Sequence, residues 1–532
     1  MLSARLLKPW PLVLCLAGMA CSGPAPQPEA HSSELVGSAD SARLARAPEP
    51  HGAVGPKRSG KLWYLLHQGD AKTLVVRMRL MQPDRRTSLF LPGSWAGVHT
   101  HADAISIRRA VGPKGPRPWK LLRAQGRVDI DTEGLPWVDF EYEIKLAPTH
   151  TSASRFSAQH LDGGFFAYAP TLFVLPSARW SARLIDIPVE IHVPKAHTLM
   201  STWPLKRRAL SRANQQMATY GYVIKDIESL RDAFVATTGS LKTLRGPGVE
   251  VAFSPEFEGS REAIAQVIHR VLAGYARAYG DLGDVSVLVR ALPKKGDALW
   301  GTGRRGGFVL ELPNGATVDD DLEVLVAHEA LHLWNGHTLI PAPKQERRTR
   351  WFKEGVTHYI ALRSAHKRGL IDRARVLTEW AQAAQRYALY HAKPQMRQAL
   401  SHRYHYDRGV LLAVAMEATL GDPHLMDRWM VALLRASQRS PRPYTQAHLL
   451  EALLSASAQD AALTPLWSAH VQQDKLLDIK GMFASIGLHW LPRAGQRAAR
   501  LMPLNQPDSK QMYLNMTGHQ EEPSHEHPPS AD

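Results

Sequence analysis

The most informative segment of the sequence is Asp319-Asp-Asp-Leu-Glu-Val-Leu-Val-Ala-His-Glu-Ala-Leu-His-Leu-Trp334. It opens with three aspartates, which favour the N-terminus of a helix. Further along, His328 and His332 are four residues apart and would fall on one face of that helix, so both imidazoles can reach a single Zn²⁺. Glu329 lies beside them, where it can act on a water molecule. The spacing therefore predicts a zinc-binding helix.

A third zinc ligand is expected on the next helix, Arg350-Trp-Phe-Lys-Glu-Gly-Val-Thr-His-Tyr359. Its Glu354 follows His332 by 22 residues, a separation that allows one helix, a connection and a returning helix whose carboxylate completes the site. Three protein ligands and one open position are what a catalytic zinc requires. We therefore expect one Zn²⁺ per chain.

A side chain that can stabilise negative charge is expected on a later helix, which opens with His402-Arg-Tyr-His-Tyr-Asp-Arg-Gly409. A phenol there can donate a hydrogen bond to the oxyanion of a tetrahedral intermediate. Tyr406 is the candidate donor, and Tyr404 is the alternative.

Taken in order, three motifs resemble those of the glutamate-zincin peptidases, and specifically the glycyl aminopeptidase family: His328-Glu-Ala-Leu-His-Leu-Trp-Asn335, Trp351-Phe-Lys-Glu-Gly-Val-Thr-His-Tyr359 and Tyr406-Asp-Arg-Gly409. Weaker likeness extends the resemblance over most of residues 60–490. It implies a zinc-dependent peptidase, expected to be an aminopeptidase, that acts on a peptide or protein substrate. It also implies the roles of the five residues. His328, His332 and Glu354 are the zinc ligands, Glu329 is the general base, and Tyr406 stabilises the oxyanion.

The chain departs from the family at the substrate-binding strand and at the C-terminus. Relatives carry a Gly-Gly-x-Glu strand whose glutamate binds the free amino group of the substrate, whereas Gly306-Gly-Phe-Val309 places a valine there. Glu311 is the candidate replacement, because residues two apart share one face of a strand. Gly306, Gly307 and Glu311 are thus the candidate substrate-binding residues, and both terminal and internal cleavage stay open. The PDZ domain that is common in the family is expected to be absent.

The valine at this position keeps a second class of function open. In that interpretation the chain is a catalytically inactive, peptide-binding or structural lipoprotein of the cell envelope with the same fold. All five residues of the proposed chemistry are nevertheless present, which favours an active enzyme.

The period of the apolar residues changes along the chain and indicates an α+β fold. Between residues 61 and 195 the apolar residues alternate or form short blocks between turn residues, which predicts the strands of a β-sandwich. From Asp319 onward nearly every segment has helical spacing. We therefore expect an N-terminal β-sandwich domain followed by a thermolysin-like zinc peptidase domain with a C-terminal helical lobe. The expected boundaries are 1–20 for a signal peptide, 21–56 for a disordered tether, 57–200 for the β-sandwich, 201–245 for a connecting segment of helix and loop, 246–492 for the catalytic domain and 493–532 for a disordered tail.

The first residues have the pattern of an exported protein. Arg5 and Lys8 precede an apolar run that is too short to span a bilayer. The run closes on Gly18-Met-Ala-Cys21, which resembles the processing box of bacterial lipoproteins, so Cys21 is the candidate lipid anchor. We expect an outer-membrane lipoprotein of the bacterial envelope that contacts the membrane through this anchor. A soluble periplasmic or secreted protein is the alternative.

The composition excludes several classes of protein. The chain has 532 residues, 44% hydrophobic and 21% charged, which is ordinary globular composition and excludes a mainly disordered or fibrous protein. Its two cysteines, Cys15 and Cys21, lie before the globular part, so that part has neither a disulfide framework nor cysteine-ligated zinc. The net charge is +16, yet the basic residues are dispersed and an exported chain has little access to nucleic acid. We therefore expect no nucleic-acid partner, and the oligomeric state is not predicted.

Overall fold

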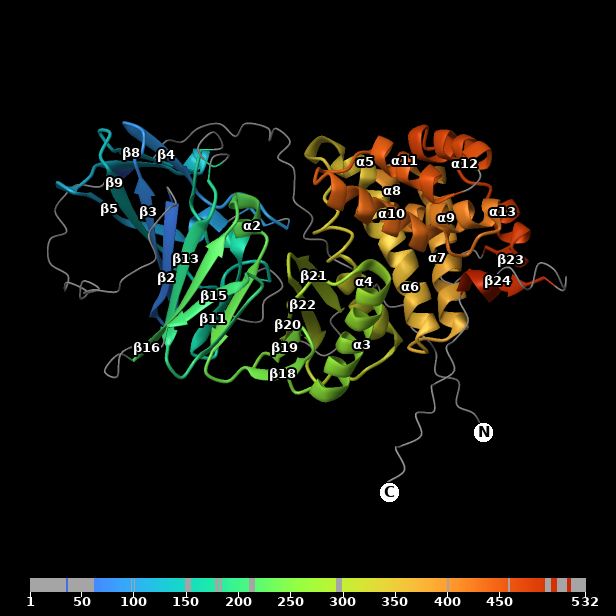
Figure 1. Cartoon of the computed structure of the whole chain (residues 1–532), viewed down its shortest axis with the longest axis horizontal. Coiled ribbons are helices and arrows are strands. Elements are labelled where there is room, and N and C mark those ends of the chain that lie inside the picture. Colours follow the sequence, from blue (N-terminus) through green and yellow to red (C-terminus); the bar gives the residue numbers. More distant parts are fainter. Residues whose placement is uncertain are drawn as a thin grey trace, which may run out of the picture. The chain divides into compact units, whose positions relative to one another are not determined.

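The computed structural model of the chain contains two compact units (Figure 1). The first unit comprises Met1–Glu258 and Gly283–Gly315, and the second comprises Gly259–Leu282 and Ala316–Asp532. The first is built of strands and the second almost wholly of helices, so the expected α+β class is confirmed. The structure describes residues 35–36, 62–96, 98–99, 101–148, 155–177, 181, 184–209, 216–292, 299–399, 401–457, 460–492, 499–504 and 514–517.

An eight-stranded sheet is the largest element of the first unit. In β13 every second side chain is buried, so the period-two interpretation of this segment is confirmed. Neighbouring strands of the sheet are antiparallel except β13 and β2, which are parallel. In spatial order the strands are β15 (Leu205–Ala209), β16 (Met217–Ile224), β13 (Ile187–Pro194), β2 (Leu62–Asp70), β3 (Thr73–Met81), β9 (Trp137–Lys145), β5 (Ile105–Gly112) and β6 (Gly115–Pro116).

A five-stranded sheet shares a core with the eight-stranded one. Apolar side chains of both sheets belong to one buried cluster, with Tyr64 and Phe140 from the larger sheet and Leu89 and Ile130 from the smaller. This packing agrees with the predicted β-rich N-terminal region. The smaller sheet contains, in spatial order, β1 (Leu35–Val36), β7 (Trp119–Leu122), β8 (Arg127–Asp131), β4 (Arg86–Phe90) and β12 (Leu175–Pro176). Short helices in this unit are η1 (His101–Ala104), η2 (Arg123–Gln125), η4 (Ala169–Thr171) and α2 (Ile227–Arg231).

Two further sheets of the first unit meet at a second apolar cluster, which contains Phe166, Tyr168, Leu288 and Val309. The four-stranded sheet has the order β10 (Gln159–Leu161), β11 (Gly164–Tyr168), β17 (Phe234–Thr238) and β14 (Thr198–Ser201). The five-stranded sheet has the order β18 (Lys242–Gly246), β19 (Val249–Phe253), β20 (Val285–Leu292), β22 (Gly307–Pro313) and β21 (Trp300–Arg304). Its three central strands are parallel and its edge strands antiparallel.

The second unit is a helical assembly (Figure 1). The side chains of α9 are buried along most of its length. Helices α6 and α7 both contact α9. The helices are α3 (Arg261–Tyr279), α4 (Asp320–Leu331), η5 (Pro343–Gln345), α5 (Glu346–Arg350), η6 (Trp351–Val356), α6 (Thr357–Lys367), α7 (Arg373–Ala392), α8 (Pro394–Ala399), α9 (Ser401–Leu420), α10 (Leu425–Arg439), α11 (Gln446–Ala456), α12 (Asp460–Leu466), η7 (Trp467–Gln472) and α13 (Ile479–Ser485). A hairpin of β23 (Leu488–Leu491) and β24 (Arg500–Pro503) follows.

The segment 201–245 differs from the predicted connection of helix and loop, because it contains β15, β16, β17 and most of β18, which belong to three sheets of the first unit. In β16 the buried side chains are Ala218, Tyr220, Tyr222 and Ile224, and the residues between them are only partly buried or exposed. Strand β16 therefore has a period of two, which its polar tyrosines and small residues obscure in the sequence. The other domain boundaries stay predictions.

Parts of the predicted tail and tether also have structure. Within 493–532, β24 pairs with β23, and Met516 and Thr517 are buried. Arg373 Nε donates a hydrogen bond to Thr517 Oγ1 at 3.1 Å, which fastens this part of the chain to α7. Within 21–56, β1 pairs with β7. The interpretation of both segments as wholly disordered is therefore wrong for these residues.

The candidate lipid anchor Cys21 and the expected signal peptide lie outside the described residues. Within the described ranges, no helix combines the length and the apolar character that crossing a bilayer requires.

Candidate metal centre

Helix α4 presents the first two candidate ligands. Asp319 caps its N-terminus, and the Asp319 carboxylate accepts a hydrogen bond from the Leu322 N–H at 2.9 Å. His328 lies in the last turn of α4, and His332 caps its C-terminus in right-handed helical conformation, so the two imidazoles share a face as predicted. Both side chains are buried, which withdraws them from bulk water.

The three predicted ligands converge on one point. His328 Nε2 and His332 Nε2 lie 3.0 Å apart, and Glu354 Oε2 lies 3.7 Å from the former and 3.2 Å from the latter. Ligand atoms placed tetrahedrally about 2.0–2.1 Å from a zinc ion lie about 3.3 Å from one another. The three donor atoms therefore fit Zn²⁺. Among the described residues, no other trio of His, Cys, Asp or Glu side chains converges in this way.

Glu354 reaches the two histidines from η6, a π-helical segment, and such segments are frequent at functional sites. This segment crosses α9 with the two backbones in contact. A Cβ atom added to Gly355 would lie 2.5 Å from Tyr406 O, and one added to Gly409 would lie 2.6 Å from Gly355 Cα. Because no side chain fits between them, the two glycines allow the close approach that brings Tyr406 next to Glu354.

Tyr406 extends from α9 to the three ligands. Its hydroxyl donates a hydrogen bond to Glu354 Oε2 at 2.9 Å and lies 3.3 Å from His328 Nε2. Its ring stacks on the imidazole of His328, with the ring centres 5.5 Å apart. Tyr404, the alternative donor, instead donates to Asp474 Oδ1 at 2.6 Å. The geometry therefore favours Tyr406, whose role as oxyanion donor stays a prediction.

Backbone and amide groups hold His332 in place. Its Nδ1 lies 3.0 Å from the carbonyl oxygen of Asn335, which can only accept a hydrogen bond, so Nδ1 carries a proton and Nε2 is the ring nitrogen that can bind a metal ion. The Asn335 amide donates to Phe352 O at 3.2 Å and to Thr357 Oγ1 at 3.0 Å. These bonds tie the end of α4 to η6 and α6. The sequence analysis did not assign this role to Asn335.

The ionisation of Glu354 and Tyr406 suits a cation-binding site. Burial raises the pKa of Glu354, but His332 and hydrogen bonds from both histidines outweigh it and hold that pKa well below its usual range. Burial lowers the pKa of His332, but Glu354 and Glu329 outweigh it and raise that pKa. Burial, Glu354 and Glu329 together keep the pKa of Tyr406 well above its usual range. The carboxylate of Glu354 is therefore ionised, while the phenol keeps its proton and acts as a donor.

Glu329, the candidate general base, lies on α4 next to His328 and is 4% exposed. Its charge raises the pKa of both His332 and Tyr406. The carboxylate is thus close enough to act electrostatically on both sides of the site. Its assignment as general base stays a prediction.

The structure adds one residue that the sequence analysis did not single out. His358 lies on α6, four residues after Glu354, and is 5% exposed. Its ring centre lies 5.6 Å from that of His328 and 6.2 Å from that of Tyr406. Burial and the neighbouring His328 hold the pKa of His358 well below its usual range, so the ring is neutral. The spacing of four from Glu354 is the sequence signal that could have found it.

The candidate substrate-binding glycines belong to the hairpin of β21 and β22 in the first unit. Gly306 has a φ of +77°, which favours glycine, and a Cβ atom added to Gly307 would lie 2.8 Å from Thr202 Cγ2. The backbone geometry alone therefore accounts for both glycines. Val309 is fully buried in the second apolar cluster. A role of Gly306 and Gly307 in substrate binding stays a prediction.

Glu311, the candidate replacement for the missing glutamate, is 5% exposed and is held by two arginines. It forms ion pairs of 3.0 Å with Arg290 Nη1 and with Arg155 Nε. The guanidinium of Arg290 lies over the ring of Phe166, and that of Arg155 over the ring of Trp300. Burial raises the pKa of Glu311, and both arginines oppose this shift. The carboxylate already has two cationic partners, so binding of a substrate amino group by Glu311 stays a prediction.

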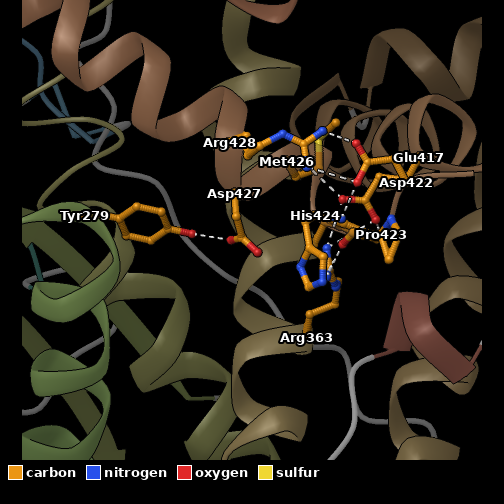
Figure 2. Close-up of polar contacts among 10 residues, drawn as sticks. Tyr279, Arg363, Glu417, Asp422, Pro423, His424, Met426, Asp427 and Arg428 are labelled. Carbon is orange, nitrogen blue, oxygen red and sulfur yellow. Dashed lines mark hydrogen bonds and ion pairs between the residues drawn. The ribbon is translucent and has the colours of Figure 1, made fainter. Parts of the chain in front are cut away.

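A second polar cluster joins α6, α9 and α10 (Figure 2). Glu417 on α9 is fully buried and accepts hydrogen bonds from Tyr359 Oη at 2.6 Å, Arg363 Nη1 at 2.9 Å and Met426 N at 3.1 Å. Arg363 also donates to the carbonyl oxygen of Pro423. This cluster fastens α6 to the same helix that carries Tyr406.

Comparison with known proteins gives a family match for one segment. Residues 321–405 match the model of the M61 glycyl aminopeptidase family, and this segment contains His328, His332 and Glu354. Comparison with curated protein sequences finds no match. The predicted resemblance is confirmed, and the buried His-His-Glu set in the matched segment is the zinc site of a metallopeptidase.

Solved structures with the same fold support the architecture. An aminopeptidase N family protein from Idiomarina loihiensis is similar with a TM-score of 0.64 and 15% identity, over 81% of this chain and 79% of that chain. An M1 zinc metallopeptidase from Deinococcus radiodurans is similar with a TM-score of 0.50 and 16% identity, over 77% of this chain and 94% of that chain. A mutant of the latter bound to a Tyr-Ser-Ala substrate has a TM-score of 0.50 and 15% identity, over 76% of this chain and 92% of that chain.

Proposed function

We propose that this zinc metallopeptidase is an aminopeptidase that removes residues from the amino end of peptides. The observation that carries the proposal is the buried set of His328, His332 and Glu354, whose donor atoms have the spacing of zinc ligands. The match to glycyl aminopeptidases supports the type of reaction. The tripeptide bound to a mutant of the Deinococcus enzyme supports short peptides as substrates.

Each residue of the site has one task in this proposal. A zinc ion bound by the three ligands supplies Lewis acidity to the scissile carbonyl and to the attacking water. Glu329 accepts the proton of that water and passes it to the leaving amine. Tyr406 donates a hydrogen bond to the substrate oxygen that becomes negatively charged, and its raised pKa keeps the donor protonated.

The test is the variant Glu329→Gln, with zinc content and hydrolysis measured on the same sample. We expect about one zinc per chain in the variant and a rate of hydrolysis reduced by about 10²–10⁴-fold. The matched control is Glu323→Gln, because Glu323 is another buried glutamate of α4. The control should retain both zinc and activity. Equal hydrolysis by Glu329→Gln and the wild type, or a wild type without zinc, would overturn the proposal.

A separate experiment tests whether cleavage requires a free amino terminus. It uses one series of peptides, each with either a free or an acetylated amino terminus. Cleavage restricted to the free peptides supports an aminopeptidase. Equal cleavage of the acetylated peptides would show an endopeptidase. The test matters because Val309 is buried and Glu311 already pairs with two arginines.

A second candidate function is that of a peptide-binding or structural protein without turnover. The same buried Val309 and arginine-bound Glu311 favour it, because an exopeptidase of this family would need a carboxylate for the substrate amino group. Zinc-loaded wild-type protein that binds the free peptides but releases them uncleaved would support this function over the first.

The location of the protein is a further part of the proposal. The pattern Gly18-Met-Ala-Cys21 supports export and a lipid anchor on Cys21. The wild-type chain, expressed in a Gram-negative bacterium, should sediment with outer membranes, and the variant Cys21→Ser should not be lipid-modified. Wild-type protein that is unmodified and free in the periplasm would support the soluble alternative.

A further inference from the structure

The two histidine ligands are supported in different ways. His332 is oriented by a hydrogen bond, because its Nδ1 lies 3.0 Å from the Asn335 carbonyl. His328 is flanked by rings. Tyr406 stacks on it at an interplanar angle of 25°, and His358 meets it nearly edge-on at an angle of 65°. The rings of Tyr406 and His358 therefore border the imidazole of His328 on two sides.

His358 is well placed to support His328. It follows Glu354 by four residues along η6 and α6, so both side chains lie on the side of this segment that faces α4 and α9. Its ring is buried and contacts both His328 and Tyr406. Its Nδ1 is buried and makes no hydrogen bond with any residue that the structure describes. Its described contacts at the site are therefore ring contacts.

We propose that His358 is a positioning residue of the metal site, which holds the imidazole of His328 in the orientation that zinc binding needs. Removal of a residue that orients a metal ligand typically weakens metal binding by 10–100-fold. Here the group behind the ligand is a second imidazole that acts through packing. The proposal rests on the zinc site of the proposed function, and it does not depend on whether the protein turns over a peptide.

The experiment measures the dissociation constant for zinc of the full chain by competition with a chelator. His358→Ala should bind zinc about 10–100-fold more weakly than the wild type. The matched control is His366→Ala. His366 is a second buried histidine of α6, 2% exposed, and its Nδ1 bonds to the Ile371 carbonyl at 3.0 Å. This control should lose thermal stability as His358→Ala does, yet bind zinc within about twofold of the wild type.

A second variant keeps the experiment decisive if His358→Ala folds poorly. His358→Phe retains a planar ring and removes both ring nitrogens, so it should retain most of the zinc affinity. Wild-type affinity in His358→Ala would overturn the inference, and so would a loss in His358→Phe as large as that in His358→Ala. If the wild type itself binds no zinc, the proposed function fails first. If the wild type and His358→Ala bind zinc equally, only the proposed role of His358 is wrong, and the proposed function is unaffected.

Discussion

Two contacts of the same kind join α9 to the continuous segment of η6 and α6, but the groups that surround each contact differ. At the metal centre, Tyr406 on α9 donates to the buried Glu354 of η6 at 2.9 Å. Farther along, Tyr359 on α6 donates to the buried Glu417 of α9 at 2.6 Å. Each place thus has a tyrosine hydroxyl on a buried carboxylate. They differ in the remaining partners, because Glu354 has two imidazoles and Glu417 has the guanidinium of Arg363.

This difference separates a binding site from a structural one. A buried carboxylate is stable when a permanent positive charge and further hydrogen bonds satisfy it. Arg363 supplies such a charge to Glu417, together with the N–H of Met426 (Figure 2). The imidazoles beside Glu354 offer lone pairs that converge with the carboxylate, which is the donor set that a zinc ion needs. We therefore expect metal binding to depend on the first place and the packing of the helices on the second.

The variant Glu354→Gln should have the largest effect. The free energy of zinc binding to structural protein sites is about 10–16 kcal/mol. The loss of one of three ligands should therefore weaken zinc binding by roughly a thousandfold. Hydrolysis should be lost with the metal. Zinc content after dialysis, measured by atomic emission, checks this expectation.

Glu417→Gln is the matched control, since it makes the same chemical change in another buried glutamate between the same helices. It should retain zinc and lose stability instead. Equal loss of zinc in both variants would show that the two places are not functionally distinct.

The variant Arg363→Met should have the next largest effect. It leaves Glu417 buried without its cationic partner, and breaking a buried ion pair in this way typically costs about 3–5 kcal/mol in the free energy of unfolding. Urea denaturation can follow it through the tryptophans Trp351, Trp380, Trp429 and Trp467, which are buried in the second unit. Zinc affinity should stay near that of the wild type.

The double variant Arg363→Met/Glu417→Gln tests the cause. Because it removes the uncompensated charge, it should recover part of the lost stability. If the double variant is as unstable as Arg363→Met alone, the stem of the arginine and its packing, rather than the ion pair, stabilise this cluster.

The sequence was sufficient for the ligands but not for the structure that supports them. His328, His332, Glu354 and Tyr406 could be predicted because helical spacing and short motifs place them locally. By contrast, Glu417 meets Tyr359 across 58 residues, and no periodicity in either segment indicates this pairing. Long-range packing decides such contacts, so they are visible only in the folded chain.

One open prediction and one error of interpretation have the same origin. Glu311 was correctly placed on the strand after Gly306-Gly307, yet its partners Arg155 and Arg290 come from elsewhere in the first unit. The strands within 201–245 were missed because their small and tyrosine residues give a weak apolar alternation. In both cases the surrounding sheets, and not the segment itself, determine the outcome.

Gly355 and Gly409 lie where η6 crosses α9 at the metal centre. A substitution at this crossing should have an intermediate effect. Gly355→Ala would place a Cβ atom 2.5 Å from Tyr406 O, so the backbones of η6 and α9 must separate. Such overpacking typically costs about 1–3 kcal/mol. Because the separation moves Tyr406 away from Glu354, hydrolysis should fall by more than zinc affinity does.

Gly93→Ala is the control for this variant, because a Cβ atom added at Gly93 would meet nothing within 4 Å. It should leave both the stability and the rate of hydrolysis nearly unchanged. A Gly355→Ala variant with wild-type stability would mean that η6 and α9 can separate without cost, and that the close crossing does not position Tyr406.

The smallest change is the removal of one oxygen atom from either tyrosine, and it makes the comparison most direct. In Tyr359→Phe the ring can stay stacked on Trp380, with ring centres 5.6 Å apart, while the hydrogen bond to Glu417 is lost. Hydrogen bonds to charged groups contribute about 1.5–3 kcal/mol, so stability should fall by that order with kcat unchanged.

Tyr406→Phe should show the opposite pattern, with kcat reduced by about 10²–10³-fold if its phenol stabilises the oxyanion. Steady-state kinetics and urea denaturation on both variants measure the two quantities. A loss of kcat in Tyr359→Phe would mean that the second contact also sets the position of Tyr406, because the two places share α9.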